Sequence, residues 1–298
     1  MCGIVGLFLK DPKLEPQLGA LLNDMLITMT DRGPDSAGFA VYTRGTPGQA
    51  KLTLQSADPD KDFAGLAEAL GEAIGTKVTA ERKDTHVVLT LPTEKLEQAR
   101  KAVTELRPSV TVMSAGEEIE IFKEVGLPKD VAARFHLESM AGTHGIGHTR
   151  MATESAVTTA GAHPFSTGDD QCLVHNGSLS NHNSVRRMLQ KAGMTFQTAN
   201  DTEVAAAYLS HKIKEGASLG DAMEATIDDL DGFFNFVVGT KEGFGVVRDP
   251  IACKPAVMAE TDQYVAFASE YRAFVNLPDI EHARVWEPEP ATVYFWER

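Results

Sequence analysis

The chain begins MCGIVG, so a cysteine stands directly behind the initiator methionine and ahead of an apolar run. If Met1 is removed, Cys2 carries both a thiol and a free α-amine, which makes it a nucleophile with its own base. The pKa of an α-amine is about 7.7–8.0, so the amine can take the thiol proton and return it to a leaving group near neutral pH. The alternative is that Cys2 simply starts a buried strand, because free cysteine behaves as a small hydrophobe.

The tripeptide His175-Asn176-Gly177 follows the apolar end of QCLV and offers a second chemical element. A thiol that cleaves an amide needs donors for the oxyanion, and the Asn176 side-chain amide and the Gly177 N–H can supply them. Glycine also permits an unusual backbone angle where a strand runs into a turn. An isolated HNG is otherwise an ordinary turn, so this motif alone leaves both interpretations open.

Two charged residues could hold an amino acid as substrate. Arg150 in GHTRMAT has a guanidinium fork that suits a carboxylate, although a surface ion pair is the simpler explanation of a single arginine. Asp201 in NDTE could accept from an ammonium group, or it could cap the next helix together with Asn200 and Glu203. Taken with the thiol and the oxyanion donors, these residues match every polar group of free glutamine.

The segments that must position these motifs predict two packed sheets with helices outside. Residues 2–9 indicate a buried strand, 16–30 has apolar residues at helical spacing, and GFAVYT is a second strand after the turn-rich DRGPDSAG. Beyond residue 142 the pattern predicts a helix over 183–191 and another within QTANDTEVAAAYLSHKIKEG. Four strand runs typical of a meander follow, namely FFNFVVGT, GFGVVRDP, PAVMAE and YVAFASE.

The stretch from about residue 44 to residue 140 has a different pattern. It indicates strand, helix, strand, helix and a final strand pair, SVTVMSA with EEIEIFKEV, as in a small two-layer α+β module of the ferredoxin-like or ACT type. The stretch contains no ligand motif. We therefore expect an inserted subdomain over 44–140 with a structural or partner-binding role, and a regulatory ligand site is the alternative.

Composition excludes several classes of function. The 28 basic and 42 acidic residues give a formal charge of −14, which argues against a nucleic-acid or anionic-membrane surface. Cys2, Cys172 and Cys253 are far apart, so we expect no disulfide framework and no metal or iron–sulfur site within this chain. The apolar opening is too short to span a membrane and has no basic region before it, so we expect a cytoplasmic protein.

The stretches MCGIVG, DRGPDSAG, GHTRMAT, LVHNG and NDTE, in this order, resemble the class II glutamine amidotransferases, whose glutaminase domain is an N-terminal-nucleophile hydrolase. With the C-terminal strands they span nearly all of the chain except the insert. The resemblance implies an α+β fold, a four-layer αββα sandwich over residues 2–298 that contains the small insert. It also implies that the chain hydrolyses L-glutamine through a Cys2 thioester.

The resemblance further assigns roles to individual residues. It implies that Cys2 is the nucleophile after Met1 is removed and that Asn176 and Gly177 form the oxyanion hole. The remaining implied site residues bind the substrate or support the nucleophile: Arg150 for the glutamine carboxylate, Asp201 for its ammonium, Met151, Thr153 and His175 in the substrate site, and Arg32 as support. Many relatives have HTRWATHG where this chain has HTRMATES, so Met151 replaces a tryptophan that packs in the glutamine pocket, and Glu154 replaces a histidine.

The methionine form, with AHPF, VGTKEGFGVVRDPIACKPA and FASEYRAF, is similar to the glutamate synthase-like group. There the glutaminase can be a separate subunit, as in N-methylglutamate synthase, whose companion chains carry a flavin (FMN) and an iron–sulfur cluster. We therefore expect a hetero-oligomer with glutamate synthase-like partner subunits and no cofactor in this chain. The alternative is a catalytically silent structural or regulatory subunit in which Met1 is retained. The Cys2 nitrogen then stays in a peptide bond and cannot act as a base.

Overall fold

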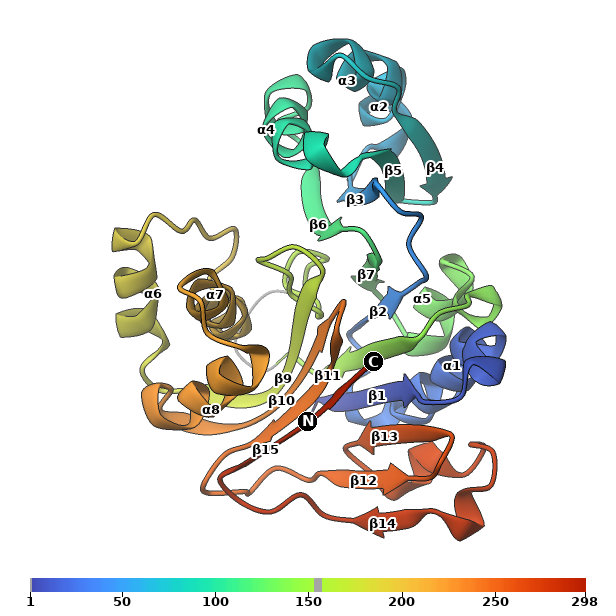
Figure 1. Ribbon diagram of the computed structural model, residues 1–298, viewed down its shortest axis with the longest axis vertical. Coiled ribbons are helices and arrows are strands. Elements are labelled where there is room, and N and C mark those ends of the chain that lie inside the picture. Colours follow the sequence, from blue (N-terminus) through green and yellow to red (C-terminus); the bar gives the residue numbers. More distant parts are fainter. Residues whose placement is uncertain (1, 153–156) are drawn as a thin grey trace.

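The computed structural model describes residues 2–152 and 157–298, and its main body contains two antiparallel sheets packed face to face (Figure 1). The larger sheet has the strand order β14-β12-β13-β1-β8-β2-β7, and the smaller has the order β15-β11-β10-β9. The strands of the larger sheet are β1 (Gly3–Leu9), β2 (Ser36–Tyr42), β7 (Ile119–Val125), β8 (His144–Arg150), β12 (Val257–Glu260), β13 (Tyr264–Ala268) and β14 (Arg284–Trp286). Those of the smaller sheet are β9 (Gln171–Leu179), β10 (Gly232–Thr240), β11 (Gly243–Arg248) and β15 (Thr292–Glu297).

Strand β1 shows why the chain opens with an uninterrupted apolar run. Ile4 and Phe8 belong to the core between the two sheets, whereas Val5 and Leu7 pack in the core under helix α1 (Leu18–Thr28). Successive residues of a strand face opposite sides of its sheet, so a strand that is covered on both sides needs apolar residues throughout. The buried strand predicted over residues 2–9 is therefore confirmed for Gly3–Leu9, whereas Cys2 lies just before the strand and is partly buried.

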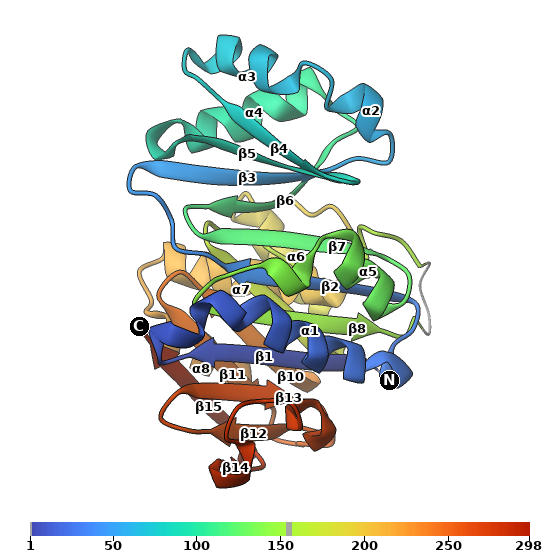
Figure 2. The same cartoon turned by 90° about the vertical axis from the view of Figure 1, so that its right-hand side faces the viewer.

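Helices cover both outer faces and complete a four-layer αββα sandwich (Figures 1 and 2). Helices α1 and α5 (Pro128–Arg134) lie on the larger sheet, and α6 (His182–Lys191), α7 (Asp201–Lys214) and α8 (Leu219–Asp229) lie on the smaller one. Short 3-10 helices occur at Pro12–Gln17, Thr30–Arg32, Thr93–Lys95, Leu137–Ser139, Tyr271–Phe274 and Ile280–His282. The predicted sandwich is confirmed. Within the described ranges, no helix combines the length and the apolarity needed to cross a membrane.

A smaller unit stands on the main body as an insert (Figure 2). Its strands have the order β4-β5-β3-β6, and they are β3 (Gln49–Gln55), β4 (Thr79–Lys83), β5 (His86–Pro92) and β6 (Thr111–Gly116). Helices α3 (Leu66–Ile74) and α4 (Leu96–Leu106) share an apolar core with this sheet, and α2 (Pro59–Asp62) precedes them. Taking α2 and α3 together, the chain order β-α-β-β-α-β is that of a ferredoxin-like module, one of the two types expected.

Two details of the insert differ from the prediction. The predicted strand pair at its end is wrong, because β6 belongs to the insert whereas β7 pairs with β2 in the larger sheet, with Phe39 opposite Phe122. The range 44–140 thus contains elements of the main body at its C-terminal end. Strand β4 was not predicted, since its sequence TAERK has no apolar residue larger than alanine and is mostly exposed. It is a strand because it pairs with β5.

The C-terminal half also differs in two details. The four predicted strand runs do not form one meander, because β10 and β11 lie in the smaller sheet and β12 and β13 in the larger. Helix α8 was not predicted, although Ser218 caps it by accepting a hydrogen bond from the Asp221 N–H at 3.1 Å. A serine followed three residues later by an acidic residue is the sequence signal for the start of this helix.

Candidate active site

Cys2 lies immediately before β1, where predicted site residues from distant parts of the chain converge. Its carbonyl oxygen accepts hydrogen bonds from Arg32 Nε at 2.9 Å and from Asn176 Nδ2 at 3.2 Å. The antiparallel register between β1 and β8 places the chain just before β1 beside Arg150, the last residue of β8. The structure thus brings together four residues with predicted roles: the nucleophile Cys2, the oxyanion donor Asn176, the supporting Arg32 and the carboxylate-binding Arg150.

Strand β9 carries the predicted oxyanion hole into this region. Asn176 is held by the register of β9, in which it lies opposite Asn235 of β10. Its side-chain amide has two hydrogens, and the bond to the Cys2 carbonyl uses one of them, so the second stays available. Gly177 has a φ of 154°, and a Cβ there would lie 1.9 Å from the Phe233 carbonyl oxygen. Position 177 therefore requires glycine for both conformation and space.

Arg150 is 7% exposed, and the backbone beside it is held on both sides by Asp35. The Asp35 N–H donates to the Arg150 carbonyl at 3.1 Å, and Asp35 Oδ2 accepts from the Ala152 N–H at 2.8 Å. Met151 follows with 38% of its surface exposed. Thr153, predicted as a substrate-binding residue, lies outside the described residues.

Asp201 is the first residue of α7, but it is not the cap of that helix. Asn200 takes this role, since its Oδ1 accepts from the Thr202 N–H at 2.8 Å. The Asp201 carboxylate instead accepts from the Leu179 N–H at 3.0 Å, and its Oδ1 lies 3.6 Å from His175 Nδ1. Burial by itself would raise the pKa of Asp201, but His175 and the Leu179 N–H outweigh it and lower this pKa to about 2. The carboxylate is ionised at neutral pH, as an acceptor for an ammonium group must be.

Buried histidines support this carboxylate from the interior. Thr202 Oγ1 lies 3.1 Å from His175 Nδ1 and 2.7 Å from His163 Nε2. The His163 ring stacks on His148 with centroids 4.0 Å apart, and His148 Nε2 donates to the His175 carbonyl at 3.1 Å. Burial lowers the pKa of His148 to about 3 and also lowers that of His163. Both rings are therefore neutral at pH 7 and hold His175 without adding charge.

Arg32 is fixed by an acidic residue from the far end of the chain. Its Nη1 donates to Glu270 Oε1 at 2.7 Å, and Glu270 Oε2 pairs with Arg272 Nε at 2.6 Å. The hydrogen bond from Arg32, with the charge of Arg272, lowers the pKa of Glu270. Glu270 thus orients the guanidinium that binds the Cys2 carbonyl.

Four of these supporting residues were not predicted as members of the site: Asp35, His148, His163 and Glu270. Each lies within a short stretch that the sequence already distinguishes, namely DRGPDSAG, GHTRMAT, AHPF and FASEYRAF. Their motif positions were the available signal, but the direction of each side chain depends on contacts between strands far apart in the sequence.

Comparisons with known proteins identify relatives of this chain. A family model described as a glutamine amidotransferase domain matches residues 148–276. The glutamine amidotransferase-like protein GlxB of Rhizobium meliloti is 68% identical over 297 residues, which cover 100% of this chain and 98% of that protein. A putative glutamine amidotransferase of Methanothermobacter thermautotrophicus is 35% identical, with 99% of each chain covered.

Solved structures share the fold at lower identity. The allosteric regulatory enzyme of purine biosynthesis matches with a TM-score of 0.61, and the glutamine phosphoribosylpyrophosphate amidotransferase from B. subtilis matches with 0.59, each at 20% identity. The match covers 99% of this chain but 47% of each of those chains, so it spans about half of their length. These two structures bear on the fold alone.

Proposed function

The chain belongs to the class II glutamine amidotransferase family, since it matches two glutamine amidotransferase relatives along almost its whole length, and on this premise we propose that it hydrolyses L-glutamine at Cys2. One observation carries the proposal. Arg32, at the end of the 3-10 helix Thr30–Arg32, and Asn176 of β9 both bind the carbonyl of Cys2 and hold this residue beside the predicted oxyanion hole.

In the proposed reaction, removal of Met1 frees the Cys2 amine, which takes the thiol proton as the sulfur attacks the side-chain amide carbon of glutamine. The resulting oxyanion accepts hydrogen bonds from Asn176 Nδ2 and the Gly177 N–H. When the carbon–nitrogen bond breaks, the proton passes from the amine to the leaving nitrogen, which departs as ammonia and leaves a thioester. The same amine then activates water, and hydrolysis releases glutamate and restores the thiol.

The substrate is oriented by its two charged groups. The Arg150 guanidinium would bind the α-carboxylate through parallel hydrogen bonds, and the ionised Asp201 would bind the α-ammonium. His175 supports Asp201 from the interior, and Met151 and Thr153, which follow Arg150 directly, would border the bound glutamine. We propose these roles from the chemistry of the groups and from their places around Cys2.

We also propose that a separate glutamate synthase-like chain receives the ammonia. The two relatives that match end to end have nearly the length of this chain, whereas the match spans 21% of a glutamine–fructose-6-phosphate aminotransferase of Shewanella oneidensis. The nitrogen acceptor would then be bound by companion chains, as in N-methylglutamate synthase. FMN and an iron–sulfur cluster would reside on those chains, and this chain would act in a hetero-oligomer.

Ammonia release from glutamine by the purified chain, with its intact mass, tests the first proposal. We expect a mass that lacks Met1, and we expect Cys2→Ala to abolish the activity while the matched Cys253→Ala, which alters an exposed cysteine, retains it. Glutamine hydrolysis by Cys2→Ala would refute the proposal. A native chain that keeps Met1 and releases no ammonia would instead identify a catalytically silent subunit.

The partner proposal is tested on the complex purified from its native source. Within that complex, Cys2→Ala should remove glutamine-dependent synthesis and leave synthesis from added ammonia intact. Loss of both activities in a complex that still assembles would contradict transfer of ammonia from this chain to its partner.

A further inference from the structure

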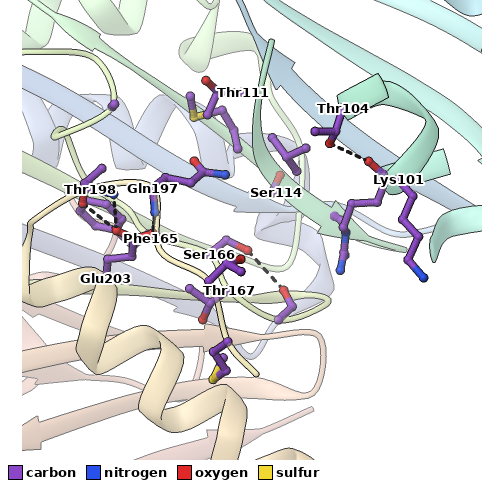
Figure 3. Close-up of a pocket in the computed structure, with 18 of the residues that line it drawn as sticks. Lys101, Thr104, Thr111, Ser114, Phe165, Ser166, Thr167, Gln197, Thr198 and Glu203 are labelled. Carbon is purple, nitrogen blue, oxygen red and sulfur yellow. Dashed lines mark hydrogen bonds between the residues drawn. The ribbon is translucent and has the colours of Figure 1, made fainter. Parts of the chain in front are cut away.

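A polar cavity of about 590 Å³ lies between the insert and the main body (Figure 3). Thr111 and Ser114 of β6 line one side, and Thr167, Thr198 and residues near them line the other. Of the residues assigned to glutamine, none that the structure describes lines it. Its volume is within the range of small-molecule sites, about 300–1,000 Å³.

Lys123 of β7 lines this cavity and is buried, with 4% of its surface exposed. Its Nζ donates to the carbonyl oxygens of Ala162 at 2.8 Å, Pro164 at 3.0 Å and Ala160 at 3.5 Å. Three acceptors match the three N–H groups of an ammonium, whereas a neutral amine has only two. The Phe165 ring, with its centroid 4.3 Å from Nζ, also favours the cation. The geometry is therefore that of a charged lysine.

This charge forms no salt bridge with a carboxylate in the described part of the chain. Glu203 lines the same cavity, but its oxygens accept from the Gln197 N–H at 2.7 Å, the Thr198 N–H at 2.8 Å and the Thr198 hydroxyl at 2.7 Å. Burial lowers the pKa of Lys123 to about 7, and Glu203 acts in the opposite direction. A buried charge without a counter-ion costs free energy that a bound anion would offset.

The cavity also presents hydrogen-bond donors. Ser114 is 1% exposed, and within the described ranges its Oγ has no hydrogen-bond partner. Buried hydroxyls normally have one, so this group is available to a ligand. Lys101 of α4 is exposed at the edge of the same cavity and adds a second ammonium. Donors and cations call for a ligand rich in acceptor oxygens.

We propose that this cavity is a binding site for a small anion that presents carboxylate or phosphate oxygens and supplies the counter-charge to Lys123. The groups that would hold this anion, Lys123, Ser114 and Lys101, are not part of the glutamine site, so anion binding does not depend on the proposed glutaminase activity. The site would give the insert a ligand-binding role, because Lys101 and Ser114 come from the insert and Lys123 from the main body.

Isothermal titration calorimetry on the whole chain at low ionic strength tests this site with three probes: inorganic phosphate, succinate and AMP. We expect saturable binding of at least one probe, and the pattern distinguishes phosphate from carboxylate recognition. Ser114→Ala should weaken that binding roughly tenfold, because one hydrogen bond to a charged ligand is lost. The matched control is Thr53→Val, which removes a buried hydroxyl that also lacks a partner in the described chain, on the strand paired with Ser114 but outside the cavity lining. Its affinity should equal that of the wild type.

A second pair of variants keeps the test independent of packing around Ser114. Lys101→Gln should weaken binding roughly threefold at low salt, since a solvent-exposed charge contributes little to binding. Lys77→Gln on the exposed insert surface should have no effect. The absence of saturable binding for all three probes would overturn the proposal. Equal affinities of Ser114→Ala and Thr53→Val, or displacement of the probe by glutamine, would overturn it as well.

Discussion

Replacing Asp201 by asparagine tests the proposed ammonium site. The change removes the charge and keeps an oxygen that can accept from the Leu179 N–H, which lies 3.0 Å from the carboxylate. A hydrogen bond to a charged group contributes about 1.5–3 kcal/mol, so kcat/KM for glutamine should fall about 10- to 150-fold. The folded-state pKa of Asp201 is about 2, so its contribution is present at neutral pH and is lost only as the pH falls toward that value.

The assay compares two substrates by ammonia release: glutamine, and glutaramate, which is glutamine without its α-ammonium group. For the wild type, kcat/KM should be higher for glutamine than for glutaramate, by about the factor by which Asp201→Asn lowers kcat/KM for glutamine. For the variant, the two kcat/KM values should be almost equal. This comparison isolates the pairwise interaction, because each single change removes the same contact.

Asp228→Asn is the matched control, since it alters an exposed carboxylate on α8 and should leave both rates unchanged. The expected loss applies to protein whose thermal unfolding matches the wild type. An equal loss by Asp201→Asn on glutamine and on glutaramate would show that Asp201 does not contact the ammonium, and it would refute the assigned role.

Three further predictions follow from the geometry. Gly177→Ala should lower kcat at least about 100-fold or prevent folding, because its Cβ would meet the Phe233 carbonyl. Gly193→Ala is the control, because Gly193 also has a positive φ but has nothing within 4 Å of an added Cβ, and its effect should be far smaller. Similar effects of the two variants on the glutaminase rate and on the melting temperature would contradict this prediction. Glu270→Gln should lower kcat about 10- to 100-fold with little change in the KM for glutamine, since Glu270 acts on Cys2 through Arg32; a change confined to KM would contradict the positioning role. The free energy of unfolding, measured with urea, should fall as the pH drops from about 6.5 toward about 3. In the folded protein, burial lowers the pKa of each of three histidines to about 3, namely His86, His144 and His148. In the unfolded chain these histidines take up a proton at about pH 6.5, so acid favours the unfolded chain. A flat urea midpoint across that range would be inconsistent with neutral buried rings.

The candidate site was predictable as a set of residue types, because each polar group of glutamine requires one partner of known chemistry. The sequence could not show that Cys2 and Asn176, which are 174 positions apart, share a hydrogen bond. Nor could it show how Asp201 and Asn200 divide their roles, since both residue types suit a helix start. The motif position of Glu270 was a signal, but its role could not be predicted, because that role depends on packing against Arg32 rather than on its neighbours in sequence.

The fold was predictable where periodicity alone determines an element. Alternation in IEIFKEV correctly indicated a strand at 119–125, but alternation does not say which sheet a strand joins, and β7 joins the larger sheet. The polar strand β4 has no such pattern. It is a strand because its register partner β5 supplies the hydrogen bonds. Pairing between distant segments is thus the information that local sequence lacks.

The first turn of α7 shows how one short segment can serve several sites. Successive residues of an α-helix point in directions about 100° apart, so neighbours in sequence face different surroundings. Asn200 caps the helix, Asp201 faces the end of β9, Thr202 contacts the buried histidines, and Glu203 lines the cavity under the insert. Because Asn200 satisfies the helix start, the Asp201 carboxylate is released from capping and remains available to a ligand. An acidic residue at a helix start is therefore a stronger ligand candidate when the residue before it already provides the cap.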